Sequence, residues 1–435
     1  MFLARLLVLF SLVCISCAHS SFEQKQLKHA LDFATSNRLE LEILLQHYTY
    51  DSLKLEAAKF LIRNMPHCYS YQQGGEMDSV KRVRTYYSPF GQIDQTYARR
   101  WGHYTYRNLP KIYDAHIITA EYLIDNIDRA FDNWQKRPWN RSLSFEDFCE
   151  YLLPYRIGDE PLEEWRELYE KKYGYLLDSI YKGGDVVEAA NLVSRHLQEP
   201  VFIYCEDFEL PHIGPRYLFS HRYGSCVDAA DIVTYAFRAV GIPCMEDTDA
   251  RGGHVWNVVR DTTGRDVPIW YIASEAVRGS RDTGGYKRGK VYRPMYGFQE
   301  EKAAHLGDDW KSMPLLFYHP YMKDVSYAYY PDTLRILTGI PDDEVCYLAH
   351  FHEAHWWSCA CARSASGKME IPNLESELVY LPMKYTKSNY YPSDFPFWFA
   401  GGEINTFLPD WEKTVKVRLY RKYPVYGWLR SFMSH

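Results

Sequence analysis

The sequence predicts a multidomain α+β protein, because the spacing of its apolar residues changes twice along the chain. Residues 18–200 repeat apolar side chains at helical spacing, and residues 201–304 combine one helix with antiparallel strands. Residues 305–435 contain short alternating runs separated by turn residues, which is typical of a β-sandwich-like domain. A chain of 435 residues is long enough for two or three domains.

Caps and apolar stripes predict a helical N-terminal region. Asp51-Ser52 can cap a helix whose apolar stripe covers residues 55–62. A second stripe covers residues 117–131, and Ser144 opens a third helix with nearly a capping box. Stripes of this kind are typical of a packed core, so we expect a helical scaffold here.

The middle region predicts a helix followed by two strands. A strand-like run at residues 201–205 precedes an amphipathic helix that begins at Cys226 and stops before Gly241. Residues 254–259 and 267–273 read as strands, and the polar segment between them supplies a turn. We therefore expect an α+β unit.

The C-terminal region predicts strands instead of a zinc site. His355 follows His352 by three residues, whereas the zinc-protease motif places its two histidines four residues apart. We therefore expect a solvated hairpin here, in which His350 and His352 share one strand face. Cys359 and Cys361 also share a face and are interpreted as core residues. The predicted strands are residues 344–351, 356–362, 377–385 and 414–420.

Composition excludes one broad class of function. The net charge is −6 and no long basic run is present, so the chain lacks the electrostatic signature of a nucleic-acid-binding protein. Aromatic residues make up 16% of the chain, which favours aromatic-rich β structure or contacts with glycans and peptides. No motif predicts a metal ion or another cofactor.

The first residues are typical of an export signal. Arg5 supplies a positive charge before an apolar stretch at residues 6–13, which is too short to span a bilayer. Ser16-Cys17 resembles a lipoprotein cleavage site, which predicts a signal peptide over residues 1–17 and a lipid on Cys17. We expect a location in the cell envelope, anchored by lipid to the outer membrane or cell surface. The segment Ala18-His-Ser offers the alternative of ordinary cleavage, which would make the protein secreted or periplasmic.

The cysteine pattern predicts neither a disulfide framework nor a thiolate zinc site. Ten cysteines are present, and two of them lie in the signal segment. The other eight are scattered and include no C-x-x-C pair. Export would permit disulfides, but a chain of this size does not need them, so the pairing stays open.

The arrangement of Cys226 and His254 predicts a reactive thiol. Cys226 stands at the start of a helix, and His254 follows 28 residues later at the start of a strand. A helix N-terminus and a neighbouring imidazolium both stabilise a thiolate. The alternative is that Cys226 packs as a small apolar residue.

Four phrases of this region carry a family resemblance. YGSC, AFRAVGIPC, GGHVWNVV and VPIW resemble the core of the transglutaminase-like superfamily, a papain-related cysteine fold, over residues 205–295. The phrases LEAAKFLIRNMPHCYSY, ITAEYLIDNIDRAF and FCEYLLPYRIG also fit multidomain Bacteroidetes-type lipoproteins. The resemblance implies that Cys226 is the nucleophile, that His254 is the base, and that residues 201–304 form a transglutaminase-like domain.

The third catalytic member is where the chain departs from this family. Family members place an aspartate on the strand after the histidine, and Trp270 stands at about that position. Glu275 at the end of the strand is the preferred replacement, with Asp266 as an alternative that the turn before the strand suits better. Asn257 could also orient the imidazole, and a site with no third member stays open.

The residues before Cys226 are candidates for stabilising an oxyanion. The backbone N–H of Cys226 would supply one donor, and Tyr217, His221 or Tyr223 could supply another. Gly224 would let the backbone turn sharply into the helix and leave space for a substrate carbonyl.

Two functions remain possible from the sequence. The first is a cysteine enzyme that transfers or hydrolyses acyl groups of peptide or amide substrates, as a peptidase, an amidase or a cross-linking acyltransferase. The second is a non-catalytic surface lipoprotein that uses the fold as a scaffold for binding glycan or protein, and the residue at Trp270 favours it. In both cases the expected contact with a membrane is the lipid anchor alone.

Overall fold

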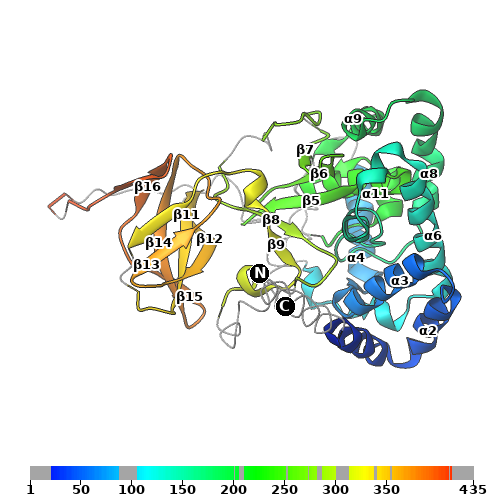
Figure 1. Cartoon of the computed structure of the whole chain (residues 1–435), viewed down its shortest axis with the longest axis horizontal. Helices are drawn as coiled ribbons and strands as arrows, with labels where there is room; N and C mark the ends of the chain where they lie inside the picture. The colour runs from blue at the N-terminus through cyan, green and yellow to red at the C-terminus, as the bar shows by residue number, and fades with distance from the viewer. Residues whose placement is uncertain are drawn as a thin grey trace, which may run out of the picture.

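The computed structural model describes residues 21–87, 105–199, 201–204, 210–250, 253–272, 274–281, 287–299, 313–337, 340–352, 355–410 and 412–413. The described chain mixes helices with several separate sheets (Figure 1). This arrangement confirms the predicted α+β class in its general form. The signal segment, Cys17 and the strand predicted at 414–420 lie outside the described residues.

The N-terminal region is helical, as its caps predict. Asp51 caps α3 by accepting a hydrogen bond from the Lys54 N–H at 3.1 Å, and Ser144 caps α7 in the same way from Asp147 at 3.0 Å. A short antiparallel ribbon, β1–β2, joins Tyr69–Tyr71 to Lys111–Tyr113. The helices are α2 (Arg38–His47), α3 (Ser52–Asn64), α4 (Gly75–Tyr87), α6 (Ala120–Lys136), α7 (Phe145–Tyr151), α8 (Arg166–Tyr175) and α9 (Val186–Leu197).

The centre of the molecule is helix α11 (Cys226–Val240) packed on an antiparallel five-stranded sheet of order β7-β6-β5-β8-β9 (Figure 1). Val259, Val267 and Ile269 share one apolar cluster with α11, whereas Trp256 and Val258 pack on the other face of the sheet. The strands are β5 (Cys244–Asp249), β6 (Val255–Arg260), β7 (Asp266–Ile269), β8 (Val291–Pro294) and β9 (Met322–Asp324). Shorter elements lead into α11: β3 (Ile203–Tyr204), α10 (Pro215–Ser220) and β4 (Tyr223–Gly224).

Helix α11 differs from the amphipathic helix that the sequence predicts. Every residue of α11 except Val227 is buried, because α8, α9 and α6 surround the helix on the sides that the sheet does not cover. A helix enclosed in this way has no solvated face, so its polar side chains need partners within the protein.

The C-terminal region consists of two sheets around one apolar cluster. The larger has the order β12-β11-β14-β16-β17 with β15 beside β14, and the smaller pairs β10 with β13. β11 and β12 form a hairpin in which His352 pairs with His355, so the hairpin is confirmed, but most of β11 is buried and the prediction that the hairpin is solvated is wrong. The strands are β10 (Leu334–Leu337), β11 (Val345–His352), β12 (His355–Arg363), β13 (Lys368–Ile371), β14 (Leu378–Thr386), β15 (Asn389–Pro392), β16 (Phe397–Ala400) and β17 (Glu403–Thr406).

The central and C-terminal regions are joined by contacts between their residues as well as by the chain connection. Strand β9 follows residue 305 in sequence but completes the central sheet, and a short helix, α13 (Leu315–Tyr318), precedes it. The Tyr292 hydroxyl in β8 donates to the Cys359 carbonyl of β12 at 2.8 Å. The boundaries near 200 and 305 stay predictions.

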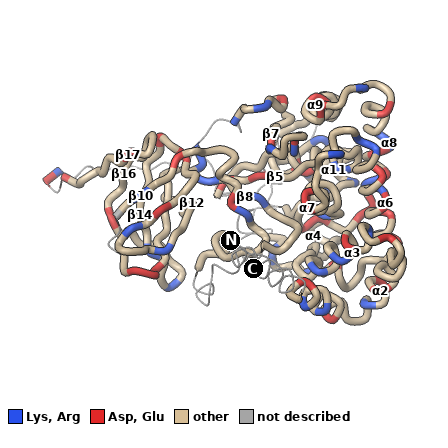
Figure 2. Tube along the Cα trace, in the orientation of Figure 1, with Lys and Arg blue, Asp and Glu red and all other residues tan. Residues whose placement is uncertain are grey.

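Charge is distributed evenly over the described chain. Figure 2 shows basic and acidic residues interspersed along the helices and strands. None of the helices in the described ranges is both long and apolar enough to cross a bilayer.

Gly241 should be essential to the end of α11. It adopts a φ of +83°, and an added Cβ would lie 2.8 Å from both the Arg137 Cγ and the Asn133 carbonyl oxygen. We expect Gly241→Ala to lower the free energy of unfolding by about 1–3 kcal/mol more than Gly264→Ala, measured by denaturant unfolding. Gly264 is the matched control, because its φ of +77° is similar and no atom lies within 4 Å of its added Cβ. Equal losses in the two variants would contradict this account.

Candidate thiol site at the start of helix α11

Cys226 is the first residue of α11, and the two residues around it explain why a cysteine can stand there. Ser225 occupies the N-cap position, and its backbone N–H donates to Asp228 Oδ2 at 2.8 Å. Because these residues cap the helix, Cys226 has no capping task. Its N–H belongs to the first turn, whose amides have no partner inside the helix.

A buried ion pair lies directly in front of this helix start. Arg84 Nη2 of α4 is 2.6 Å from Asp228 Oδ2, and both side chains are buried. Gly224 has a φ of +156°, and an added Cβ would lie 2.3 Å from both of these atoms. The structure therefore places the ion pair in the space beside Gly224, where the sequence predicted room for a substrate carbonyl.

Helix α4 closes over the predicted site through two consecutive residues. Beside the Arg84 ion pair, the Thr85 hydroxyl lies 2.8 Å from the Tyr217 hydroxyl, and the Arg84 guanidinium lies over the Tyr223 ring. Tyr217 and Tyr223, two of the predicted oxyanion candidates, are thus in contact with α4, while the His221 ring stacks on Tyr217. Cys226 itself is 2% exposed.

The pairing of β5 with β6 brings His254 to the same end of α11 as Cys226. Asn257 Nδ2 donates to the Ala230 carbonyl at 3.1 Å and to the Thr234 hydroxyl at 2.9 Å, which fixes β6 against the middle of α11. From Asn257 back to His254 is about 10 Å along a strand. From the midpoint between Ala230 and Thr234 back to Cys226 is about 9 Å along the helix.

The direction of β6 relative to α11 follows from its pairing with β5, the strand between them in the chain. Cys244, which follows α11 closely, pairs with Val259 near the end of β6. The C-terminal end of β6 therefore lies near the C-terminal end of α11, and the N-terminal end of β6 lies near the N-terminal end of α11. Asn257 is committed to α11 and does not take the predicted role of orienting the imidazole.

The His254 imidazole contacts two indole rings. Its centroid is 4.5 Å from that of Trp270, edge to face, and 5.7 Å from that of Trp256, stacked. Trp270 thus lies against the imidazole, where the family would have a carboxylate. An indole N–H only donates, so Trp270 cannot accept a hydrogen bond from the imidazole N–H as an aspartate would.

Glu275, the preferred third member, is engaged elsewhere. Its Oε1 is 2.6 Å from Arg195 Nη1 of α9, and both side chains are 54% exposed. This surface pairing leaves the predicted orienting role of Glu275 without structural support.

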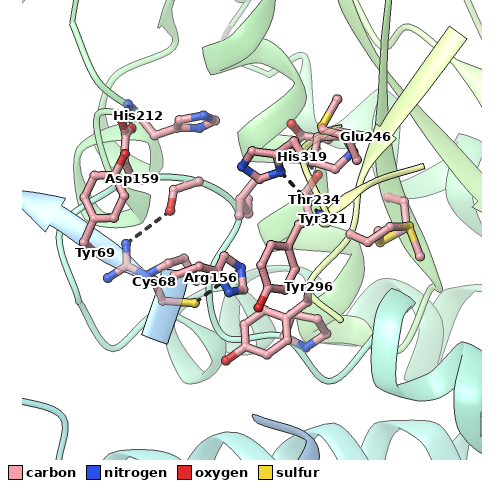
Figure 3. A pocket seen from close by; sticks show the side chains of 18 of the residues that line it. Cys68, Tyr69, Arg156, Asp159, His212, Thr234, Glu246, Tyr296, His319 and Tyr321 are labelled. Carbon is pink, nitrogen blue, oxygen red and sulfur yellow. Dashed lines mark hydrogen bonds between the residues drawn. The ribbon is translucent and has the colours of Figure 1, made fainter. Parts of the chain in front are cut away.

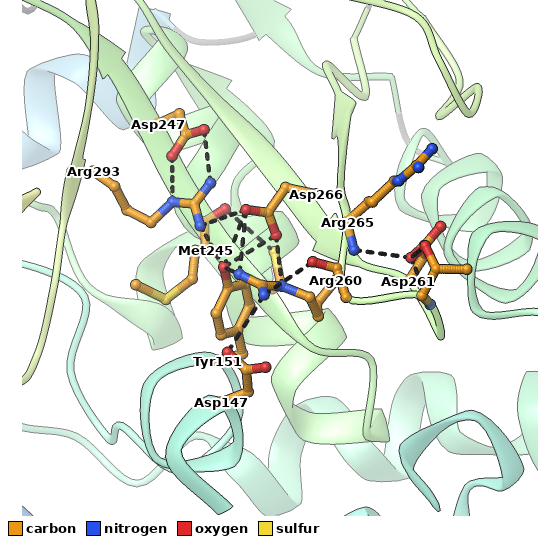
Figure 4. Close-up of polar contacts among 12 residues, drawn as sticks. Asp147, Tyr151, Met245, Asp247, Arg260, Asp261, Arg265, Asp266 and Arg293 are labelled. Carbon is orange, nitrogen blue, oxygen red and sulfur yellow. Dashed lines mark hydrogen bonds and ion pairs between the residues drawn. The ribbon is translucent and has the colours of Figure 1, made fainter. Parts of the chain in front are cut away.

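Asp266, the alternative third member, belongs to a buried ion network (Figure 4). Its two oxygens lie 2.8 Å from Arg260 Nε and 2.8 Å from Arg293 Nη1, and Arg293 Nε in turn lies 2.6 Å from Asp247 Oδ1. Burial raises the pKa of the Asp266 carboxyl, but the two guanidinium groups outweigh it and hold that pKa below its ordinary value. Asp266 is therefore a structural anion that joins β7 to β8.

The other described cysteines are buried core residues, except Cys361, which is partly exposed, so the prediction of a core residue holds for Cys359 but not for Cys361. All seven cysteines within the described ranges carry free thiols. Burial raises the pKa of both Cys68 and Cys244 to about 12, which keeps these thiols protonated and unreactive at neutral pH. The remaining three cysteines, Cys14, Cys17 and Cys205, lie outside the described residues.

The histidine-rich hairpin forms no metal site in the described part of the chain. His350 is fully buried in β11, and His352 faces His355 at the hairpin end. Within the ranges that the structure describes, no group of three or more His, Cys, Asp or Glu side chains is placed to hold a metal ion.

Sequence reasoning missed Arg84, the residue that closes the site. It lies 144 residues before its partner Asp228, and no local pattern links them. The available signal was Asp228 itself, an acidic residue two places after the cysteine of a helix that proves to be buried throughout.

The chain was also compared with known proteins. No family model, curated protein or solved structure matches it. The resemblance to the transglutaminase-like superfamily therefore enters below as part of a proposal.

The Arg84–Asp228 ion pair should contribute strongly to stability. We expect Arg84→Ala to lower the free energy of unfolding by about 3–5 kcal/mol, because the Asp228 carboxylate loses its buried counter-ion. Arg82→Ala is the matched control on the same helix, and since Arg82 is exposed we expect a change within about 0.5 kcal/mol. Denaturant unfolding of both variants measures the difference, and similar values for the two would contradict the assignment.

Proposed function

We propose that the chain is a transglutaminase-like cysteine protein that transfers or hydrolyses acyl groups of peptide or amide substrates through Cys226 and His254. One observation carries the proposal. Helix α11 begins at Cys226, and the N-terminal end of β6, which directly follows His254, lies beside this helix start. A helix N-terminus and an imidazole at that position are the two groups that activate a thiol.

The chemistry follows from these groups. The Cys226 thiolate attacks the carbonyl carbon, and the amide N–H of Cys226 stabilises the oxyanion. As the C–N bond breaks, the His254 imidazolium gives its proton to the leaving amine, and a thioester remains. Attack by water on the thioester gives hydrolysis, whereas attack by an amine gives cross-linking. Each route releases the thiol again.

The imidazole must work in this scheme without a carboxylate partner. His254 directly precedes the first residue of β6, so it lies at the edge of the sheet near the start of α11. Its ring also contacts the indole of Trp270. Trp270 restricts the ring by packing, but it does not stabilise the imidazolium by accepting a hydrogen bond. We therefore expect a dyad with lower activity than a triad.

Two observations favour a second candidate function, a non-catalytic scaffold on the cell surface. The Trp270 contact with His254 and the ion pair of Arg84 in α4 with Asp228 would both suit a protein that binds glycan or protein and performs no chemistry. In that case Cys226 is a packing residue.

Thiol labelling separates the two candidates. An ordinary thiol with a pKa of about 8.5 reacts about fiftyfold more slowly at about pH 6.5 than at pH 8.5. For the proposed enzyme we expect the iodoacetamide labelling rate of Cys226 to fall less than about fivefold over this range, and to fall like an ordinary thiol in His254→Ala. Site-resolved mass spectrometry of the intact chain measures both rates.

The control is within the same protein. Cys361 of β12 is partly exposed and lies away from any helix start, so it supplies a reference labelling rate in the same protein. For each thiol, the ratio of the labelling rates at the two pH values is compared, which removes the effect of the low exposure of Cys226. If Cys226 shows the same ratio as Cys361, the enzyme proposal is rejected.

We also propose that the protein is anchored to the cell envelope by a lipid on Cys17. The apolar stretch before Ser16-Cys17 supports this assignment. Replacing Cys17 with Ser should move the protein from the membrane fraction to the soluble fraction, as measured by fractionation and immunoblotting. Unchanged membrane association of this variant would reject the anchor.

A further inference from the structure

A cavity of about 300 Å³ lies between the N-terminal helices and the central sheet, and Cys226 and His254 do not line it. Its walls come from the segment after α3, the segment after α7, α11, β5 and the stretch that leads into β9. Figure 3 shows Asp159, His212 and Tyr69 on one side of the view, and Glu246, Thr234 and Tyr321 on the other. Its volume is at the lower end of the range for small-molecule sites, which begins at about 300 Å³.

Three cationic side chains at this cavity, Arg156, His212 and Arg238, already have acceptors within the protein. Arg156 donates from Nε to Asp114 at 2.5 Å, and His212 Nδ1 lies 2.9 Å from an oxygen of Asp231. Burial opposes the charge of His212, but Asp231 outweighs it and raises the pKa of His212 well above its ordinary value. Arg238 donates to backbone carbonyls. These groups offer little to an anionic ligand.

The carboxyl groups at the cavity, in contrast, have few hydrogen-bond partners among the described residues. Asp159 is 9% exposed and Glu246 is 8% exposed, and both line the cavity. One oxygen of Asp159 accepts from the His212 N–H at 2.9 Å, and one oxygen of Glu246 accepts from the Thr234 hydroxyl at 2.7 Å. The second oxygen of each has no hydrogen bond to the part of the chain that the structure describes. Both carboxyl groups therefore have acceptor capacity to spare.

The pKa values of both carboxyl groups reflect their burial. Burial, and then the neighbouring Asp231, raise the pKa of Glu246 to about 8, and burial raises the pKa of Asp159 above its ordinary value. His212 and neighbouring arginines offset this effect of burial only in part, and a cation that entered the cavity would stabilise the ionised carboxylates further.

Aromatic rings complete the walls. Lys111 Nζ lies 4.2 Å from the centre of the Tyr69 ring, so this wall already holds an ammonium group of the chain itself. The His67 ring stacks on Tyr321 with centroids 3.6 Å apart, and burial lowers its pKa to about 3, so it is neutral. His67 Nδ1 is buried and has no hydrogen bond to the described residues. A neutral imidazole nitrogen can accept a hydrogen bond from a ligand.

We propose that this cavity is a binding site for a small organic cation, a protonated amine on an apolar body. The carboxylates of Asp159 and Glu246 would accept its N–H bonds, and the rings of Tyr69, Tyr321 and His67 would pack on its apolar part. This site is separate from the thiol site and does not depend on the proposed function.

Comparison of three probes of equal length tests the charge of the ligand. We expect n-pentylamine to bind to the full chain at least about tenfold more tightly than n-pentanol, because the alcohol lacks the cation, and pentanoate not to bind. Titration calorimetry measures the three affinities. Equal affinities for the amine and the alcohol would overturn the proposal, and this comparison needs no variant.

Variants then test the location. Glu246→Gln and Asp159→Asn keep the side-chain shape, and each should weaken n-pentylamine binding about tenfold or more. Glu370→Gln is the control, because Glu370 is exposed and pairs with Arg335 in the C-terminal region. Unchanged affinity in both cavity variants would overturn the proposed location. Nα-acetyl-lysine amide presents the same ammonium group on a peptide unit, and its affinity relative to n-pentylamine distinguishes a lysine side chain from a free amine as the natural ligand.

Discussion

The enclosure of α11 is the constraint on which the other features of this protein depend. A helix with helices on some sides and a sheet on another has little contact with water, so charged and polar side chains on it need partners inside the protein. Four polar residues of α11 follow one another at helical spacing, and each has a partner from a different part of the chain. The pairs are Asp228 with Arg84, Asp231 with His212, Thr234 with Glu246 and Asn257, and Arg238 with backbone carbonyls.

This row of buried pairs relates the thiol site to the cavity. Asp228 holds α4 over the start of the helix, and one turn further on Asp231 and Thr234 hold the residues that line the cavity. The two sites are therefore built on the same helix without sharing their reactive groups. Because a buried charge that loses its partner is costly, the row also fixes the position of α11 relative to the N-terminal helices.

The parts of this structure that depend on local sequence were predictable, and the parts that depend on distant contacts were not. Asp51 and Ser144 cap their helices as predicted, and β6 and the β11–β12 hairpin fall where the alternation of apolar residues places them. The Arg84 closure was not predictable, because its two partners are far apart in sequence. Glu275 was preferred because it stands at the end of the predicted strand, but its position in the sequence does not show that Arg195 lies beside it.

The central claim is that Cys226 is an acyl-accepting nucleophile whose neighbour His254 assists it. Mass spectrometry of the intact protein after incubation with p-nitrophenyl acetate tests this directly, since a nucleophilic thiol takes up one acetyl group as a thioester. We expect a single acetyl group on Cys226 in the unaltered protein, a much smaller fraction in His254→Ala and none at this position in Cys226→Ala. An unaltered protein that acquires no acetyl group on Cys226, while surface residues are acetylated, would contradict the claim and leave α11 as a purely structural helix.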